Sequence, residues 1–263
     1  MSRLTATIEK RLKAKQKCFV AYLTAGDPDL EKTVNYVEAL AKGGADIIEL
    51  GIPFSDPLAD GPVNQRAAER ALLQGVSLSK ILGIIPAIRK KAPEVPLVIF
   101  SYMNPIFAMG FENFAQQAEK SGADAVLVVD LPPEESLEYR KVLQKHNLDT
   151  IFLASPTSND ERLKIVDQSS SGFVYYVSRT GVTGAQTSLS TTLHEELKQL
   201  RKLSKLPIMV GFGISNAQQA KEAAIDADGV IVGSAIVKLI EEGKEVEKRL
   251  EAFAKGIRES LDH

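Results

Sequence analysis

The chain has 263 residues, a length that suits one α/β barrel, and 44% of them are hydrophobic while 25% are charged. The net charge is −2 and basic residues are scattered among acidic ones, which excludes a nucleic-acid-binding face. No apolar run approaches the ~20 residues that span a bilayer. The lone cysteine, Cys18, cannot form an internal disulfide, so we expect a cytoplasmic protein without a membrane segment.

In chain order, short apolar runs alternate with longer amphipathic segments. Residues 5–15 predict a helix over the bottom of a barrel, and the apolar run after it is favoured as a buried strand over a secretory signal because a turn and a helical pattern follow. Eight continuous apolar runs predict parallel strands, at 18–24, 46–51, 97–102, 124–130, 150–154, 172–177, 207–211 and 229–232. Helix-period segments occur at 30–42, 78–91, 114–120, 134–146, 160–167, 192–203, 217–224 and 246–261.

This alternation predicts βαβ units, and eight of them favour closure into an α/β fold of the (β/α)8 TIM-barrel type, with an open doubly wound sheet as the alternative. The extra N-terminal helix and a short extra helix after the eighth strand, at 235–241, complete the expected fold. No linker or shift in composition divides the chain, so residues 1–263 are expected to form a single barrel domain.

Lysine, histidine and cysteine side chains are poorly placed for catalysis in such a barrel, whose active site lies at the C-terminal ends of the strands. None of the expected strands contains the lysine that a Schiff-base aldolase needs. The histidines lie at a helix end, on a helix and at the C-terminus, and Cys18 opens the first strand. A metal site, a histidine-based triad and a thiol nucleophile are therefore not expected, and carboxylate chemistry remains.

Glu49 is the first candidate catalyst. Period-2 alternation in the segment DIIELGI places it opposite Ile48 and Leu50, so it faces the barrel interior near the top. Loss of hydration there raises the pKa of a carboxyl group and makes it a proton donor or acceptor near neutral pH. A carboxylate held in a structural hydrogen-bond network is the alternative.

Asp60 is the second candidate. It follows Glu49 in the segment GIPFSDPLADGP, whose prolines and glycines predict a shaped, exposed loop. Such a loop can return a carboxylate over the same pocket. On spacing alone, Asp56 and Asp60 are equally well explained as turn formers.

Glycine-rich segments follow the last three expected strands, at 181–184, 211–215 and 233–235. Glycine lets backbone N–H groups approach an anion, and the helices after the last two segments add the positive ends of their dipoles, so a phosphate site is predicted. Aromatic and apolar residues near the pocket suggest a ligand with an apolar body, although each alone is better explained as barrel core. These residues are Tyr22, Phe100, Leu127, Tyr175 and Phe212.

Seven segments along the chain together resemble one known family. They are LTAGDPD at 23–29, ELGIPFSDPLADGP at 49–62, YMNPI at 102–106, DLPPEE at 130–135, SRTGVTG at 178–184, GFGIS at 211–215 and GSAIVK at 233–238. By these segments the chain is identified as a member of the tryptophan synthase α subunit family. The resemblance runs from the first helix to the last, and the second segment is long and highly specific.

The resemblance implies a retro-aldol cleavage of indole-3-glycerol phosphate to indole and D-glyceraldehyde 3-phosphate, without a Schiff base or a metal. It implies that Glu49 shuttles protons to C3 of the indole and from the side-chain hydroxyl, and that Asp60 binds the indole N–H. Tyr175 would line the pocket beside Glu49. Thr183 would close over the site and orient Asp60.

The resemblance also implies the phosphate contacts. Backbone groups at Gly184, Gly213 and Gly233, together with Ser234, would hold the phosphate. One residue departs from the family pattern: where the family usually has a phenylalanine on the first strand, this chain has Tyr22, which adds a hydroxyl near the indole pocket.

Members of the family work as α2β2 complexes that pass indole to a β subunit carrying pyridoxal phosphate, so no cofactor is expected in this chain itself. Apolar and proline-rich loops on the catalytic face fit a docking surface, although such loops also pack on one another. The expected contact segments run from Pro53 to Pro57, from Asn104 to Phe111 and from Asp130 to Glu135. Neither a nucleic acid nor a membrane is expected as a partner.

Other functions stay open at this point. One is a different phosphate-binding barrel enzyme, such as a phosphosugar isomerase or a stand-alone indole-3-glycerol-phosphate lyase, and another is a regulatory subunit that activates its partner. Glu49 and Asp60 argue against a purely regulatory role, since such a subunit needs neither carboxylate. Activity of the isolated chain distinguishes a stand-alone enzyme from a subunit.

Overall fold

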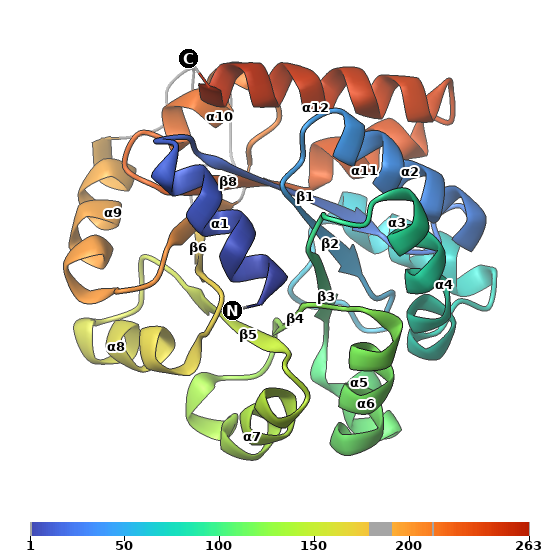
Figure 1. The fold of residues 1–263 in the computed structure, drawn as a ribbon, viewed down its shortest axis with the longest axis horizontal. Helices are drawn as coiled ribbons and strands as arrows, with labels where there is room; N and C mark the ends of the chain where they lie inside the picture. Colours follow the sequence, from blue (N-terminus) through green and yellow to red (C-terminus); the bar gives the residue numbers. More distant parts are fainter. Residues whose placement is uncertain (1, 179–190, 212, 263) are drawn as a thin grey trace.

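The computed structural model describes residues 2–178, 191–211 and 213–262, and it shows a closed barrel of eight parallel strands surrounded by helices (Figure 1). Each strand pairs with the next one along the chain, and β8 (Gly229–Val232) pairs with β1 (Cys18–Thr24) to close the sheet. The expected (β/α)8 barrel is confirmed, and the open doubly wound alternative is wrong.

The strands between β1 and β8 are short and mostly buried, because helices cover their outer face and other strands face them across the barrel. They are β2 (Ile47–Gly51), β3 (Leu97–Ser101), β4 (Ala125–Val128), β5 (Asp149–Ala154), β6 (Val174–Val177) and β7 (Ile208–Gly211). All eight expected strands are confirmed, and the first and last have the expected bounds.

Four of the outer helices begin at residues whose side chains accept free backbone N–H groups, namely α2 (Leu30–Lys42), α4 (Leu78–Lys91), α8 (Asp160–Ser169) and α10 (Ala217–Ala223). Asp29 caps α2 and Ser77 caps α4 in this way, and both helices have the expected bounds. The other later helical elements are α6 (Phe111–Ser121), η1 (Pro133–Glu135), α7 (Leu137–Lys145), α9 (Thr191–Leu203), α11 (Ser234–Glu241) and α12 (Val246–Asp262). The short helix expected after the eighth strand is α11.

The N-terminal end of the barrel is covered by α1 (Arg3–Lys13), which crosses the middle of the barrel in Figure 1. Its buried residues Leu4 and Ile8 belong to the same apolar cluster as Cys18, the first residue of β1, and Phe173, which directly precedes β6. The expected helix over the bottom of the barrel is confirmed. Burial also raises the pKa of the Cys18 thiol to about 12, as expected for an inert core cysteine.

Two helices are not predicted by the sequence pattern, and one corrects an expected loop. They are α3 (Pro62–Leu73) and α5 (Met103–Met109). The prediction of a loop from Asn104 to Phe111 is wrong, because most of this segment forms α5 and α6 begins at Phe111. Pro105 is compatible with a helix because it is the third residue of α5, where backbone N–H groups have no acceptor within the helix.

Within the described residues, no single helix is both long and apolar enough to cross a membrane. The helices α3 and α4 reach that length and apolarity only when taken together, and they are bent by 95° at the break between them.

Candidate active site

Glu49 lies in the middle of β2, beside Tyr22 of β1 and Val98 of β3. Its neighbours Ile48 and Leu50 pack in the outer apolar cluster with the helices, so Glu49 projects toward the barrel interior, as predicted. The side chain is 0% exposed, and neither carboxyl oxygen has a hydrogen-bond partner in the described part of the chain. The alternative of a carboxylate held in a structural hydrogen-bond network is not supported.

Because Glu49 is buried without a hydrogen-bond partner among the described residues, its carboxyl group favours the neutral, protonated form. Loss of hydration raises the pKa of its carboxyl group from 4.5 to about 8. At neutral pH the protonated form therefore predominates, and this form is able to donate a proton to a bound molecule.

Asp60 lies in the segment 52–61 that joins β2 to α3, and it is half-buried. Tyr102 Oη donates a hydrogen bond to Asp60 Oδ2 at 2.8 Å, and Asn64 Nδ2 donates to Asp60 Oδ1 at 3.3 Å. Burial raises the pKa of Asp60, while these two hydrogen bonds lower it. Unlike Glu49, Asp60 thus has donors that favour its ionised form.

Tyr102, directly after β3, contacts the Asp60 segment at several points. Its hydroxyl accepts the backbone N–H of Ala59 at 2.9 Å in addition to donating to Asp60, and its ring contacts Phe54 with centroids 5.2 Å apart. Sequence reasoning missed this role, although Tyr102 is the first residue of the YMNPI segment. Asn64 was missed as well, and its Oδ1 is a buried atom with no partner among the described residues.

Two tyrosines lie near both carboxylates. The negative charges of Asp60 and Glu49 contribute to raising the pKa of the Tyr22 hydroxyl, after burial, and those of Glu49 and Asp60 do the same at Tyr175. Each ring is seated against a glycine: a Cβ at Gly51 would lie 2.3 Å from Tyr22 Oη, and one at Gly211 would lie 2.7 Å from Tyr175 Oη. Both predicted tyrosines therefore project into the barrel on the same level as its acids.

Phe100 and Leu127 occupy neighbouring positions on β3 and β4. The Phe100 ring packs edge to face against Tyr22, with centroids 5.1 Å apart, and it links the apolar cluster around Tyr22 to the interior of the barrel. Leu127 is fully buried in that interior cluster. The structure thus brings Tyr22 and Phe100 together and places Leu127 deeper in the core.

The predicted phosphate residues that the structure describes lie at two turns after β7 and β8. Gly213 is exposed and has φ +77°, a conformation that favours glycine. Gly233 is the N-cap of α11 and Ser234, which is exposed, is its first residue. A Cβ at Gly233 would lie 3.3 Å from the Tyr22 ring, so the start of α11 is next to the aromatic wall. Its first backbone N–H groups and dipole suit an anion.

Thr183, Gly184 and Phe212, the remaining predicted site residues, lie outside the described residues. Within the described ranges, no group of three or more His, Cys, Asp or Glu side chains is placed to hold a metal ion. His146 contacts Glu112 and Glu119 between α6 and α7, and His194 contacts Asp226 near β8.

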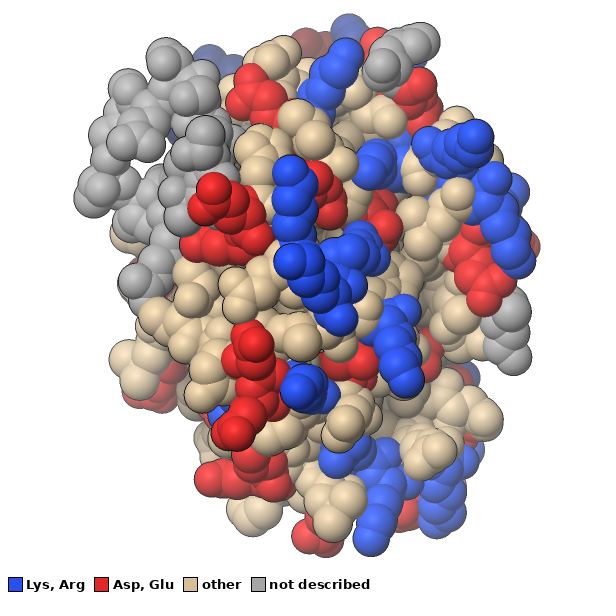
Figure 2. Space-filling model, turned by 90° about the vertical axis from the view of Figure 1, so that its left-hand side faces the viewer, with Lys and Arg blue, Asp and Glu red and all other residues tan. Residues whose placement is uncertain are grey.

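The outer surface carries mixed charge. On the side of the molecule that carries α8 and α9 in Figure 1, basic and acidic residues lie beside one another among uncharged ones (Figure 2). This agrees with the scattered charges of the sequence and its net charge of −2.

The fold and the site together define a class: a (β/α)8-barrel protein with a buried acid, inside the barrel, that has no hydrogen-bond partner among the described residues. A sequence model of the family described as tryptophan synthase alpha chain matches residues 8–261. The chain is 48% identical to the tryptophan synthase alpha chain of Geotalea uraniireducens, over 98% of this chain and 97% of that protein. It is 45% identical to the one from Geobacter sulfurreducens, over 99% of both.

Solved structures agree with these sequence matches. The tryptophan synthase subunit alpha of Legionella pneumophila superposes with a TM-score of 0.91 at 42% identity, covering 100% of this chain and 99% of that one. A chain of Mycobacterium tuberculosis tryptophan synthase superposes with a TM-score of 0.89 at 33% identity, covering 99% of this chain and 100% of that one. The chain belongs to the tryptophan synthase alpha chain family.

Proposed function

We propose that this chain, acting as the alpha chain of tryptophan synthase, uses Glu49 and Asp60 to cleave indole-3-glycerol phosphate to indole and D-glyceraldehyde 3-phosphate. It is a lyase of tryptophan biosynthesis. The observation that carries the assignment of roles is the fully buried carboxyl group of Glu49, which has no partner among the described residues and whose pKa is raised to about 8. A protein keeps such a costly group where its reactivity is used.

The first step is a proton transfer to the indole ring. Protonated Glu49 donates to C3 of the indole and becomes a carboxylate, and the ring becomes an indolenine cation with positive charge at N1. Asp60, whose carboxylate is held by Tyr102 and Asn64, accepts a hydrogen bond from the ring N–H and stabilises that charge.

The second step breaks the carbon–carbon bond. The Glu49 carboxylate takes the proton of the hydroxyl on the carbon attached to C3, and that carbon becomes the aldehyde of glyceraldehyde 3-phosphate. The electrons of the broken bond restore the double bond of the indole ring and neutralise N1. Glu49 ends protonated, so the cycle returns both acids to their starting forms.

The remaining site residues bind the two ends of the substrate. Tyr22, Phe100, Leu127, Tyr175 and Phe212 are proposed to line the indole pocket. Backbone groups of Gly184, Gly213 and Gly233, with Ser234, are proposed to bind the phosphate. The support for the second group is the start of α11 at Ser234, whose N-cap Gly233 lies against the Tyr22 ring.

Thr183 is proposed to close over the bound substrate and to orient Asp60. We further propose that residues 1–263 act as one barrel domain in the cytoplasm, a compartment that suits the single cysteine, Cys18.

We propose that the indole is passed to a tryptophan synthase β subunit in an α2β2 complex, with pyridoxal phosphate in that partner and no cofactor in this chain. The proposed contacts are the segments from Pro53 to Pro57, from Asn104 to Phe111 and from Asp130 to Glu135. Two exposed apolar side chains support a docking surface there: Phe107 on α5 is 68% exposed and Leu58, directly after the first segment, is 94% exposed.

Indole release from indole-3-glycerol phosphate, measured with and without added β subunit, tests the function. We expect turnover that the β subunit stimulates. Glu49→Gln is expected to lose about 10³-fold in turnover, the scale of general acid–base catalysis, and to keep substrate binding and association with the β subunit. Normal turnover in this variant would remove Glu49 from the mechanism, and full activity without β subunit would favour a stand-alone lyase.

A further inference from the structure

A cluster of ion pairs outside the acid–base site joins α3 to the end of α11. Arg66 of α3 donates to Glu241 through Nε at 2.8 Å and through Nη2 at 3.0 Å. Arg70, one turn further along α3, donates to the same carboxylate through Nη1 at 3.0 Å. Glu241 is the last residue of α11. We call these three residues the α3–α11 ion-pair cluster.

The cluster is anchored to the barrel through Asp27. Arg70 also donates to Asp27 through Nε at 2.9 Å and Nη2 at 2.8 Å, the two-pronged geometry that arginine forms with carboxylates. Asp27 is 1% exposed and lies in the turn directly after β1. A buried carboxylate with this partner fixes the position of Arg70 relative to the strand that carries Tyr22.

Apolar contacts join the same three elements. Ala67 and Val63 of α3 and Val237 of α11 pack in one cluster with Tyr22 of β1. The two helices and the strand therefore form a single packed unit, and α3 and α11 lie on the same side of the barrel in Figure 1.

Each helix of this unit begins at one half of the proposed substrate site. Helix α3 starts at Pro62, two residues after Asp60, and Asn64 and Gln65 of its first turn donate to the side chain and the carbonyl oxygen of Asp60. Helix α11 starts at Ser234 and ends at Glu241, so it is about 12 Å long. It connects the proposed phosphate contact at its first residue to the ion-pair cluster at its last.

We propose that Arg66, Arg70 and Glu241 are positioning residues that set the distance between the indole-binding and the phosphate-binding halves of the site. This inference rests on the proposed function, because it assumes that one ligand carries an indole at one end and a phosphate at the other. A joined ligand gains affinity over its separate parts only when both sub-sites are held at the matching distance. The cluster would keep that gain without touching the ligand.

The test compares a joined ligand with its parts. Dissociation constants are measured for indole, for glycerol 3-phosphate and for indole-3-propanol phosphate, an unreactive molecule in which a propyl chain joins the two groups. We define the linkage gain as a ratio of dissociation constants. It is the product of the constants for indole and glycerol 3-phosphate, the two fragments, divided by the constant for the joined ligand. Glu241→Gln keeps the shape of the side chain and removes its charge, and we expect the linkage gain to fall about fivefold while each fragment constant changes less than about twofold.

Glu38→Gln is the matched control. Glu38 of α2 also accepts ion pairs from two cations, Lys42 and Lys91, each at 2.8 Å, and its side chain is 25% exposed against 29% for Glu241. The pair with Lys91 links α2 to α4, and neither helix carries a residue proposed to bind the substrate. We expect Glu38→Gln to leave the linkage gain unchanged.

The inference would be overturned if Glu241→Gln had the same linkage gain as the unaltered chain. It would also be overturned if this variant lost affinity equally for the fragments and for the joined ligand. If Glu241→Gln does not fold, Arg66→Met at a half-exposed position decides the question by the same ratio. Failure of the unaltered chain to bind indole-3-propanol phosphate would instead overturn the proposed function. The two failures are thus distinguishable.

Discussion

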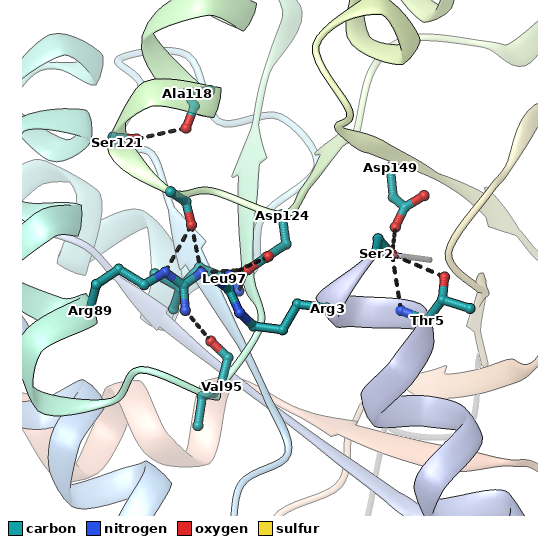
Figure 3. Close-up of polar contacts among 11 residues, drawn as sticks. Ser2, Arg3, Thr5, Arg89, Val95, Leu97, Ala118, Ser121, Asp124 and Asp149 are labelled. Atoms are coloured by element: carbon teal, nitrogen blue, oxygen red, sulfur yellow. Dashed lines mark hydrogen bonds and ion pairs between the residues drawn. The ribbon is translucent and has the colours of Figure 1, made fainter.

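Two buried carboxylates at opposite ends of the barrel, Asp124 and Glu49, have opposite surroundings, although Asp27 at the C-terminal end is paired with Arg70. At the N-terminal end, Asp124 pairs with Arg3 and Arg89 and accepts the backbone N–H of Leu97 (Figure 3). At the C-terminal end, Glu49 is fully buried and has no partner within the described residues. The carboxylate of Asp124 is thus surrounded by positive charge that compensates for its burial. No such partner among the described residues offsets the desolvation of Glu49.

The same contrast extends to the other buried acid of the N-terminal end. Asp46 pairs with Arg11 of α1 at 2.5 Å and with Arg258 of α12 at 2.8 Å, and it accepts the N–H of Phe19. These pairs attach the first and last helices to the strands. The paired carboxylates at the N-terminal end therefore contribute to stability. Glu49 has no partner within the described residues, so its burial costs stability, and we propose that the same feature supplies reactivity.

The largest effect is expected from Asp124→Ala. The change leaves the guanidinium of Arg89, whose side chain is only 14% exposed, without its carboxylate, and breaking a buried pair in this way costs about 3–5 kcal/mol. Urea unfolding measures this loss. Because Asp124 lies at the opposite end from Glu49, lyase turnover per folded molecule should stay within about twofold. A well-folded variant with little turnover would contradict the separation of the two ends.

The next largest effect is expected from Glu49→Gln, which should stabilise the fold, whereas Asp124→Ala destabilises it. Glu49 keeps its proton in the folded state up to about pH 8, while an ordinary glutamate loses it near pH 4.5, so this group destabilises the fold increasingly as pH rises between these values. We expect the free energy of unfolding of Glu49→Gln, relative to the unaltered chain, to rise by roughly 3 kcal/mol from pH 4 to pH 7. Unfolding curves at several pH values measure it. A difference that does not change with pH would show that Glu49 titrates normally in the folded protein.

A smaller effect is expected from Tyr102→Phe, which removes the hydroxyl donor to Asp60 and keeps the ring. The pKa of Asp60 should rise further, so the acid limb of the kcat/KM profile should move to higher pH by about one unit. The control is Phe54→Leu, which removes the contact with the Tyr102 ring but leaves the hydroxyl in place. An unchanged acid limb in Tyr102→Phe, or an equal shift in the control, would contradict a direct effect on Asp60.

The smallest effect belongs to His146, the C-cap of α7, whose imidazole contacts Glu119 and Glu112 of α6. Hydrogen bonds to Glu119 and Glu112 raise the pKa of His146, so its contribution to stability is fully present below its ordinary pKa of 6.5 and is lost as pH rises through the higher folded value. The stability deficit of His146→Gln should therefore be larger at pH 5.5 than at pH 9. Thermal unfolding at the two pH values measures it, and equal deficits would disprove the pairing.

Much of the fold could be predicted because its signals are local. Continuous apolar runs marked all eight strands, and helical periodicity marked segments such as 30–42 and 78–91, which are α2 and α4. The helix α5 could not be predicted, because Pro105 indicates a loop unless it is known to lie in the first turn of a helix.

The candidate site divides in the same way. Glu49 could be placed because alternation along a single strand fixes the side of the sheet that it faces. Asp60 could be placed only on a loop, and its partners Tyr102 and Asn64 could not be found. Tyr102 lies between β3 and α5, and Asn64 lies on α3, and nothing in the spacing of the segments says that these side chains meet Asp60.

By itself, the sequence determined the alternation of strands and helices, the inward direction of Glu49 and the family to which the chain belongs, because each depends on local pattern. Only the tertiary structure decided which carboxylates are paired. Asp124 and Glu49 both lie in or beside apolar strands, but closure of the barrel brings arginines from α1 and α4 to the first and no donor among the described residues to the second. A pKa depends on such neighbours in space, and these come from distant parts of the chain.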